Sequence, residues 1–224
     1  MVEINKDRNY GLRLNKSHTP IFILAPHTDD GEIGCGGLIS RCIEENLEVW
    51  YIAFSSAQIS LPPGAPKDTL IREVKAATSV LGLPEERLIL FDFETRTFPK
   101  YRQEILEELI ILRNRIQPKL ILIPSLNDIH QDHATVAHEA LRCFKKQSIL
   151  CYEEPWNNIT FSTNCFIKLS HDHIERKIQA LNCYESQKDR AYLNNEAIKG
   201  MALMRGTQLE GGYAEAFEVI RWML

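Results

Sequence analysis

Short apolar runs rich in β-branched and aromatic residues recur along the chain, and stretches with helical periodicity separate them. The runs are continuous in hydrophobicity, which is typical of strands in a parallel sheet that is covered on both faces. They predict strands over Ile21–Ala25, Val49–Phe54, Leu88–Phe91, Leu120–Pro124 and Ile149–Tyr152. The pattern between them predicts helices at about Gly36–Asn46, Asp68–Leu81, Arg102–Arg115 and Thr135–Lys145.

This repeated alternation of strand and helix indicates an α/β fold, in which helices cover a mainly parallel sheet. The pattern is looser after Tyr152. There we expect a loop over Glu153–Thr163, a strand at Cys165–Leu169, a helix at His171–Lys188 and a last strand at Phe217–Trp222. We therefore predict a single domain over residues 1–224, with a C-terminal elaboration from about residue 153.

Composition and charge narrow the possible partners. Hydrophobic residues make up 44% of the chain, which is enough to build a core. The net charge is -4, from 26 basic and 30 acidic residues, and such an acidic balance does not favour binding to nucleic acid or to an anionic membrane. Met1–Thr19 is polar, no apolar run is long enough to span a membrane, and the six cysteines form no C-x-x-C pair. We expect a cytoplasmic protein with free thiols, and a homo-oligomer is possible.

Ionisable residues directly follow the first predicted strand. His27, Asp29 and Asp30 come after Ala25-Pro26, and a glycine-rich turn then leads into a helix. In an open parallel sheet the carboxyl ends of the strands face the ligand crevice, so these side chains lie where binding and catalysis usually occur. The glycines do not spell G-x-G-x-x-G, and a dinucleotide fingerprint is not supported.

A second cluster follows the fourth predicted strand. Asp128, His130, Asp132 and His133 come shortly after Pro124. If the first and fourth strands are neighbours, both clusters meet at the point where the strand order reverses. Two histidines and one carboxylate, with open positions left over, describe a catalytic zinc site or a mononuclear non-haem iron site.

These two segments resemble a known family. Pro26–Gly37 is similar to the H-P-D-D-E and G-C-G-G signature of LmbE-like, PIG-L-type N-acetylglucosaminyl deacetylases, with Thr28 in place of the proline. Asp128–His133 resembles the second signature, H-x-D-H. Weaker similarity at Arg72-Glu73, at Ser186-Gln187 and at Tyr213–Phe217 extends the resemblance over about residues 20 to 220.

The resemblance implies a Rossmann-like three-layer α/β/α fold and a zinc-dependent hydrolase that removes an N-acetyl group from an acetamido sugar or sugar conjugate. It implies that the zinc ligands are His27, Asp30 and His133, and that Asp29 is the general base. A carboxylate beside a metal-activated water can take a proton from that water and deliver it to the departing amine.

The resemblance also implies that His130 acts on the carbonyl side of the reaction, with Asp132 setting its orientation and charge. A cationic His130 would stabilise the oxyanion, and the charge of Asp132 would raise the pKa of that imidazole. Arg72 would bind substrate hydroxyl or anionic groups. No role is assigned to four further residues of the resembling segments, Glu32, Tyr184, Tyr213 and Glu215.

Several alternatives remain open at the level of the sequence. The same ligands accept Fe²⁺ in place of Zn²⁺, and they also suit a non-haem iron oxygenase. The substrate of an amide hydrolase could be a different N-acyl conjugate. A non-catalytic sugar- or nucleotide-binding module would instead cradle phosphate at Gly34–Gly37. Specificity is expected in the loops Ser56–Lys67 and Glu153–Thr163, whose composition does not name a substrate.

Overall fold

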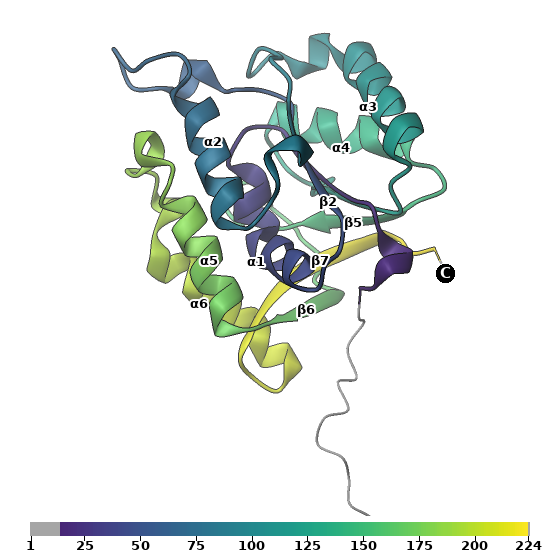
Figure 1. The fold of residues 1–224 in the computed structure, drawn as a ribbon, viewed down its shortest axis with the longest axis vertical. Coiled ribbons are helices and arrows are strands. Elements are labelled where there is room, and N and C mark those ends of the chain that lie inside the picture. Colours follow the sequence, from purple (N-terminus) through teal and green to yellow (C-terminus); the bar gives the residue numbers. More distant parts are fainter. Residues whose placement is uncertain (1–13, 224) are drawn as a thin grey trace, which may run out of the picture.

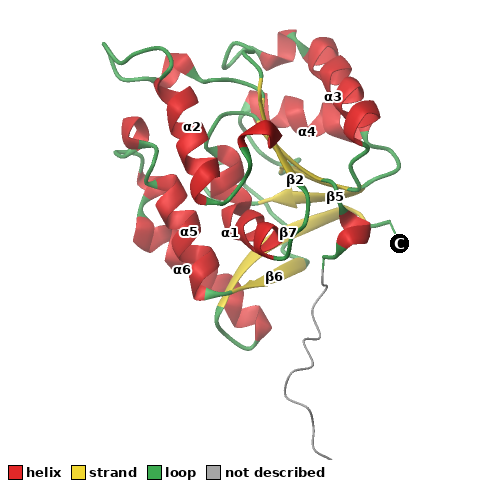
Figure 2. Cartoon of the chain, in the orientation of Figure 1, coloured by secondary structure: helices red, strands yellow, loops and turns green. Residues whose placement is uncertain are grey.

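Seven strands form one mixed sheet that lies between two layers of helices (Figure 1, Figure 2). The computed structural model describes residues 14–223, so most of the polar Met1–Thr19 segment lies outside it. The strands are β1 Ile21–Ala25, β2 Val49–Ala53, β3 Leu88–Leu90, β4 Leu120–Pro124, β5 Ser148–Tyr152, β6 Cys165–Leu169 and β7 Tyr213–Arg221. The α-helices are α1 Asp30–Glu44, α2 Thr69–Val80, α3 Arg102–Ile116, α4 Gln131–Cys143, α5 His171–Leu181 and α6 Asn195–Gly206.

The strand order is β3-β2-β1-β4-β5-β7-β6. The first five strands in the chain are parallel to one another, whereas β7 is antiparallel to both β5 and β6. The chain moves outward from β1 to β3 and then crosses back to β4, which pairs with β1. The α/β class is thus confirmed, the first and fourth strands are neighbours, and the switch point lies between β1 and β4.

Alternate residues of the central strands supply two cores. Ile21 and Ile23 of β1 pack on the side of α1, α2, α5 and α6, and Phe22 and Leu24 pack on the side of α3 and α4. Figure 1 shows these two groups of helices on opposite sides of the sheet. Because both faces of β1 are buried, its sequence is continuously apolar, as the sequence pattern predicts.

Helix α1 begins six residues earlier than the sequence predicts, so its first half contains the predicted glycine-rich turn. The helix is kinked at Cys35, where φ is -148° and ψ is 26°. Glycine is needed here for close packing: a Cβ on Gly34 would lie 2.2 Å from the Tyr152 ring. The glycines therefore let the helix approach β5.

Three C-terminal elements also differ from the prediction. Strand β7 begins at Tyr213 instead of Phe217, and α5 ends at Leu181. Helix α6 was not predicted at all. Only Ile198, Ala202 and Gly206 of this helix are buried. Its sequence therefore lacks the clear apolar stripe by which a helix is predicted.

The N–H groups after the kink are bound by a carboxylate from the far end of the chain. Gly37 N and Leu38 N donate to the carboxylate of Glu215 at 2.9 and 2.8 Å, and Lys177 Nζ lies 2.7 Å from the same group. Both charged side chains are buried. The alternative of a phosphate cradle at Gly34–Gly37 is therefore disfavoured, because this segment is buried and the Gly37 N–H is bound by Glu215.

All six cysteines lie within the described residues and are free thiols, as predicted. Within residues 14–223, every helix is too short or too polar to cross a membrane.

Candidate metal centre and active site

The two predicted clusters lie at one end of the sheet and line one cavity. The loop between β1 and α1 carries His27 and Asp29, and the segment between β4 and α4 carries His130. Because β1 and β4 are paired and parallel, both segments leave the sheet at the same edge. The cavity has a volume of about 450 Å³. Its lining includes His27, Asp29, Asp30, His130 and His133.

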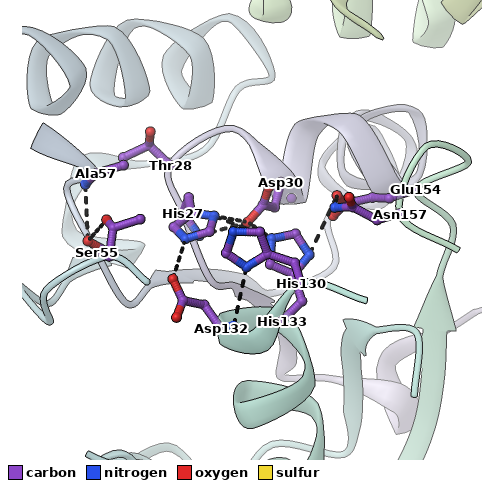
Figure 3. A network of polar contacts seen from close by, with 12 residues as sticks. His27, Thr28, Asp30, Ser55, Ala57, His130, Asp132, His133, Glu154 and Asn157 are labelled. Carbon is purple, nitrogen blue, oxygen red and sulfur yellow. Dashed lines mark hydrogen bonds and ion pairs between the residues drawn. The ribbon is translucent and has the colours of Figure 1, made fainter. Parts of the chain in front are cut away.

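Three of the predicted side chains form a triangle. Each pair among His27 Nδ1, Asp30 Oδ2 and His133 Nε2 is 3.3 Å apart. Figure 3 shows these groups gathered together, with His130 beside them and Glu154 on the side away from His27. Atoms that bind zinc tetrahedrally at about 2.0–2.2 Å lie about 3.4 Å from one another. The triangle therefore fits a metal ion of this kind, and its chemistry of two imidazoles and one carboxylate fits as well.

Buried carboxylates hold both imidazoles of the triangle by their other nitrogen. His27 Nε2 lies 3.0 Å from Asp132 Oδ2, and His133 Nδ1 lies 2.9 Å from Asp128 Oδ2. Each of these nitrogens carries a proton and donates a hydrogen bond to its carboxylate. The other ring nitrogen, which faces the triangle, therefore keeps its lone pair. The backbone N–H of His27 donates to Asp30 Oδ2 at 2.7 Å and fixes the position of this carboxylate, the third member of the triangle.

The charges around the triangle favour a cation. Burial by itself lowers the pKa of His27, yet the Asp30 and Asp132 carboxylates raise that pKa to about 10. Burial by itself raises the pKa of Asp30, but the nearby His133 and His27 bring it well below its ordinary value. A metal ion that binds here would displace a proton from the cluster.

Asp132 contacts a different partner from the one predicted. Its carboxylate accepts from His27 and from the backbone N–H groups of Arg96 and Phe98, at 2.6 and 3.2 Å for the latter two. This carboxylate therefore orients His27, whereas His130 is contacted by the backbone N–H of Asp132 and not by the carboxylate that was expected to orient it. The sequence spacing of two residues suggested His130, but Asp132 lies in the first turn of α4 and is fully buried beneath His27.

His130 is held by its backbone surroundings. It is the N-cap of α4, and its Nδ1 accepts from the backbone N–H of Asp132 at 3.2 Å. A neutral His130 ring thus carries its proton on Nε2. Burial and the charges of His133 and His27 lower the pKa of His130 to about 4, against the smaller raising effect of Asp132. The predicted cationic His130 is therefore replaced by a neutral ring with one N–H donor.

Asp29 lines the cavity beside the triangle. It occupies the N-cap position of α1, but its carboxylate makes no capping hydrogen bond. Burial, and then the charge of Asp30, raise the pKa of Asp29 to about 6. A carboxylate with a pKa near neutrality is suited to accept and return a proton.

Glu154 belongs to the site but was absent from the sequence prediction. It is 1% exposed, lines the cavity, and its Oε2 lies 3.6 Å from His133 Nδ1. Its Oε1 is buried without a hydrogen-bond partner among the described residues. Glu154 follows β5 by two residues, so the rule that placed the other two clusters at strand ends would have found it.

Arg72 does not reach the cavity. Its side chain is 62% exposed and pairs with Asp68 on the same helix at 3.2 Å. The structure therefore does not place Arg72 at the cavity where the predicted substrate contact would occur, because the guanidinium turns back along α2. The arginines that line the cavity are Arg96 and Arg190, neither of which the sequence pattern singled out.

A buried hydroxyl network supports the loop that carries the triangle. The hydroxyls of Tyr51 and Tyr184 donate to the carbonyl oxygen of Thr28 at 2.8 and 2.7 Å, and both also contact the carboxyl group of Glu32. Burial raises the pKa of Glu32 to about 8. Glu32 and Tyr184, which had no assigned role, thus help to hold the backbone of the loop at Thr28 in place.

A doubly wound sheet whose switch point carries a cavity with clustered histidines and carboxylates has the architecture of an α/β enzyme. Residues 22–144, more than half of the chain, match the family described as PIG-L, GlcNAc-PI de-N-acetylase. The chain belongs to this family of deacetylases, and the resemblance seen in its sequence is confirmed.

Three relatives are similar over most of the chain, and two of them are named as deacetylases. The diacetylchitobiose deacetylase of Thermococcus kodakarensis is 23% identical over 224 residues, which cover 89% of this chain and 82% of the relative. The solved N,N'-diacetylchitobiose deacetylase of Pyrococcus horikoshii has a TM-score of 0.75 and 19% identity, covering 89% of this chain and 83% of its own. The 4-carboxy-2-hydroxymuconate hydratase GalB of Pseudomonas putida has a TM-score of 0.74 and 20% identity, covering 91% and 97%. At these identities the two structural similarities establish the fold.

Proposed function

We propose that this protein is a metal-dependent hydrolase that removes an N-acetyl group from an acetamido sugar or sugar conjugate, with zinc as the first candidate metal. The single observation that carries the proposal is the 3.3 Å triangle of His27 Nδ1, Asp30 Oδ2 and His133 Nε2 at the floor of the cavity. These three side chains would hold the metal. Membership of a deacetylase family supports the reaction type.

The metal, when bound, lowers the pKa of a coordinated water and polarises the acyl oxygen of the substrate. Asp29 is assigned as the general base. Its carboxylate lines the cavity next to the triangle without taking part in it. It accepts the proton of the attacking water and then delivers that proton to the amine as the C–N bond breaks.

We assign to His130 the stabilisation of the acyl oxygen of the substrate. Because its Nδ1 is occupied by the Asp132 backbone N–H, the neutral ring presents Nε2–H as a donor. That N–H stabilises negative charge as it develops on the acyl oxygen. A fixed neutral donor needs no proton uptake from solvent, so His130 performs this role without the charge that the sequence suggested.

The substrate class is proposed from the relatives and from the cavity. The similarity to diacetylchitobiose deacetylases favours an N-acetylated amino sugar. Ala57 and Ser60 from one expected specificity loop, and Glu154, Trp156 and Asn157 from the other, line the cavity. We further propose that the whole chain acts as one deacetylase domain, since β6 and β7 extend the same sheet as β1–β5.

The test is a screen for acetate released from N-acetylated mono- and disaccharides, with the metal content of protein purified without a chelator measured in parallel. We expect about one equivalent of zinc or iron per chain and metal-dependent release of acetate. Asp29→Asn, tested at equal metal content, is the matched control and should release almost none. A metal-free protein that binds sugars without turnover, or a metal-loaded protein that consumes oxygen with 2-oxoglutarate, would overturn the proposal.

A further inference from the structure

One residue with an unusual backbone conformation lies beside the proposed metal site. Arg96 belongs to the segment 91–101 between β3 and α3, and its φ is 69°. This angle lies in the left-handed region, which glycine adopts freely and which other residues adopt at a cost in free energy. Such a conformation persists where surrounding contacts hold it, and it is found most often at functional sites.

The contact that holds this conformation is with a buried carboxylate. The backbone N–H of Arg96 donates to Asp132 Oδ2 at 2.6 Å, and the backbone N–H of Phe98 donates to Asp132 Oδ1 at 3.2 Å. The same Oδ2 lies 3.0 Å from His27 Nε2 (Figure 3). Asp132 is fully buried, and the part of the chain that the structure describes offers its side chain no further hydrogen-bond partner. Its orientation toward His27 therefore depends on two N–H groups of one segment.

The left-handed residue allows both N–H groups to reach one carboxylate. In an extended chain, N–H groups two residues apart are separated by roughly 6–7 Å along the strand. A residue that turns the chain brings nearby N–H groups together, and concave backbone segments of this kind bind anions. Here the anion is the side chain of Asp132, so the conformation at Arg96 contributes to the position of that carboxylate.

Other contacts fix the segment on both sides of Arg96. The side chain of Thr95 is buried, and its Oγ1 lies 2.9 Å from Ser55 Oγ after β2. Phe98 is fully buried in the core on the side of α3 and α4. The Gln131 side chain donates to the carbonyl oxygen of Arg96 at 3.4 Å. The first turn of α4 thus contacts residue 96 through both its N–H and its C=O.

We propose that Arg96 is a positioning residue of the metal centre, and that it acts through its left-handed backbone, which fixes the Asp132 carboxylate and thereby orients His27. This inference rests on the proposed function, because it gives Arg96 a role toward the proposed metal. Its consequence is that zinc affinity depends on the backbone preference of residue 96. The guanidinium group, which is exposed, is not required for this role.

The experiment compares three substitutions that all remove the guanidinium group. Arg96→Gly relieves the backbone, Arg96→Leu keeps an unbranched Cβ, and Arg96→Val introduces a β-branched side chain that opposes a positive φ. Zinc affinity is measured by competition with a coloured chelator, and the free energy of unfolding of the metal-free protein is measured with urea. The matched control is Glu210→Val, at an exposed residue outside the cavity whose φ is 64°.

We expect Arg96→Gly and Arg96→Leu to bind zinc about as tightly as the wild type. Arg96→Val should bind zinc about tenfold or more weakly, as happens when the outer partner of a metal ligand is disturbed. Glu210→Val should lower stability and leave zinc affinity unchanged. Equal zinc affinity in all three Arg96 variants would overturn the positioning role, and an equal loss in all three would assign the effect to the guanidinium group instead.

A double-mutant cycle tests whether the effect passes through Asp132. Asp132→Ala removes the carboxylate that Arg96 positions, so adding Arg96→Val should then weaken zinc binding by much less than tenfold. If the two losses multiply in full, Arg96 acts on the metal by another route and the proposal fails. If Arg96→Val does not fold, Arg96→Thr, which is also β-branched, replaces it in both experiments.

Release of acetate separates this inference from the proposed function. If the wild-type protein releases acetate with zinc but Arg96→Val keeps full zinc affinity, the function stands and the positioning role falls. If zinc affinity follows the expected order but N-acetylated sugars yield no acetate, the positioning role stands and the deacetylase proposal falls.

Discussion

His27 Nε2 lies 3.0 Å from Asp132 Oδ2, although the two residues are 105 positions apart in the chain. This contact joins the loop after β1 to the first turn of α4, and thereby connects the two sequence clusters. It also sets the tautomer of His27, because a proton on Nε2 leaves the Nδ1 lone pair directed to the triangle.

The first prediction concerns this contact. Asp132→Asn keeps the shape of the side chain but removes the charge that supports His27, so zinc affinity should fall by about 10–100-fold. Competition with a coloured chelator measures the affinity. Asp172→Asn, on an exposed residue of α5, serves as the control and should leave the affinity unchanged. An Asp132→Asn protein that binds zinc as tightly as the wild type would contradict the orienting role.

The second prediction separates catalysis from metal binding at Asp29. Its carboxylate lies outside the triangle, so Asp29→Asn should keep its metal and lower kcat by about 10²–10⁴-fold. Zinc content and the rate of acetate release are measured on the same preparation. The assignment as general base is refuted if the variant loses its metal and regains full activity when metal is added back.

The third prediction tests the donor role of His130. His130→Ala removes the N–H that we propose stabilises the acyl oxygen, and it should lower kcat by about 10²–10³-fold, with little change in KM. His138→Ala on the same helix provides the comparison, since His138 is exposed and contacts the Ala134 carbonyl. If the His130→Ala variant changes KM alone, His130 binds the ground state instead.

The fourth prediction concerns stability and the metal. A ligand that binds only the folded state at 100 times its Kd stabilises it by about 2.7 kcal/mol, and each kcal/mol corresponds to about 2–4 °C in a chain of this size. Chelation should therefore lower the Tm of the wild-type and Asp29→Asn proteins by about 5 °C or more. His133→Ala should show almost no such shift, because it lacks a proposed ligand. A shift of equal size in His133→Ala would exclude His133 from the ligand set.

The fifth prediction concerns the buried pair of Lys177 and Glu215. Lys177→Met leaves the Glu215 charge buried without its partner, so the free energy of unfolding should fall by about 3–5 kcal/mol. Urea unfolding measures this loss. Adding Glu215→Gln should recover part of it, since the uncompensated charge is then removed. If Lys177→Met alone is as stable as the wild type, the ion pair contributes nothing to the free energy of unfolding.

The cluster of histidines and carboxylates in the cavity could be predicted from the sequence, because it depends on which residues directly follow a buried strand. A continuous apolar run identifies a buried parallel strand, and the residues after it must lie at the ligand edge of the sheet. That rule placed the two clusters at one point of the sheet, and the family resemblance selected His27, Asp30 and His133 from them. The structure brings these residues into the predicted cluster, while their roles as metal ligands stay a proposal.

Side-chain partnerships between distant segments did not follow from the sequence. Asp132 is two residues from His130, but its carboxylate turns to His27, because the helix that begins there directs the two side chains differently. Arg72 turns back to Asp68, whereas Arg190 reaches the cavity through a turn anchored on Glu73. Such choices depend on packing in three dimensions, and residue spacing does not record them.

The sheet order has a consequence for how the chain folds during its synthesis. Strand β7 leaves the ribosome after the other six strands of this sheet, yet it lies between β5 and β6, which are made earlier. Until residue 213 has emerged, the backbone edges of β5 and β6 have no partner between them, and Glu215 is not yet present to bind the kinked helix that begins with Asp30. Nascent chains stopped before β7 should therefore be prone to aggregation and unable to complete the cavity floor.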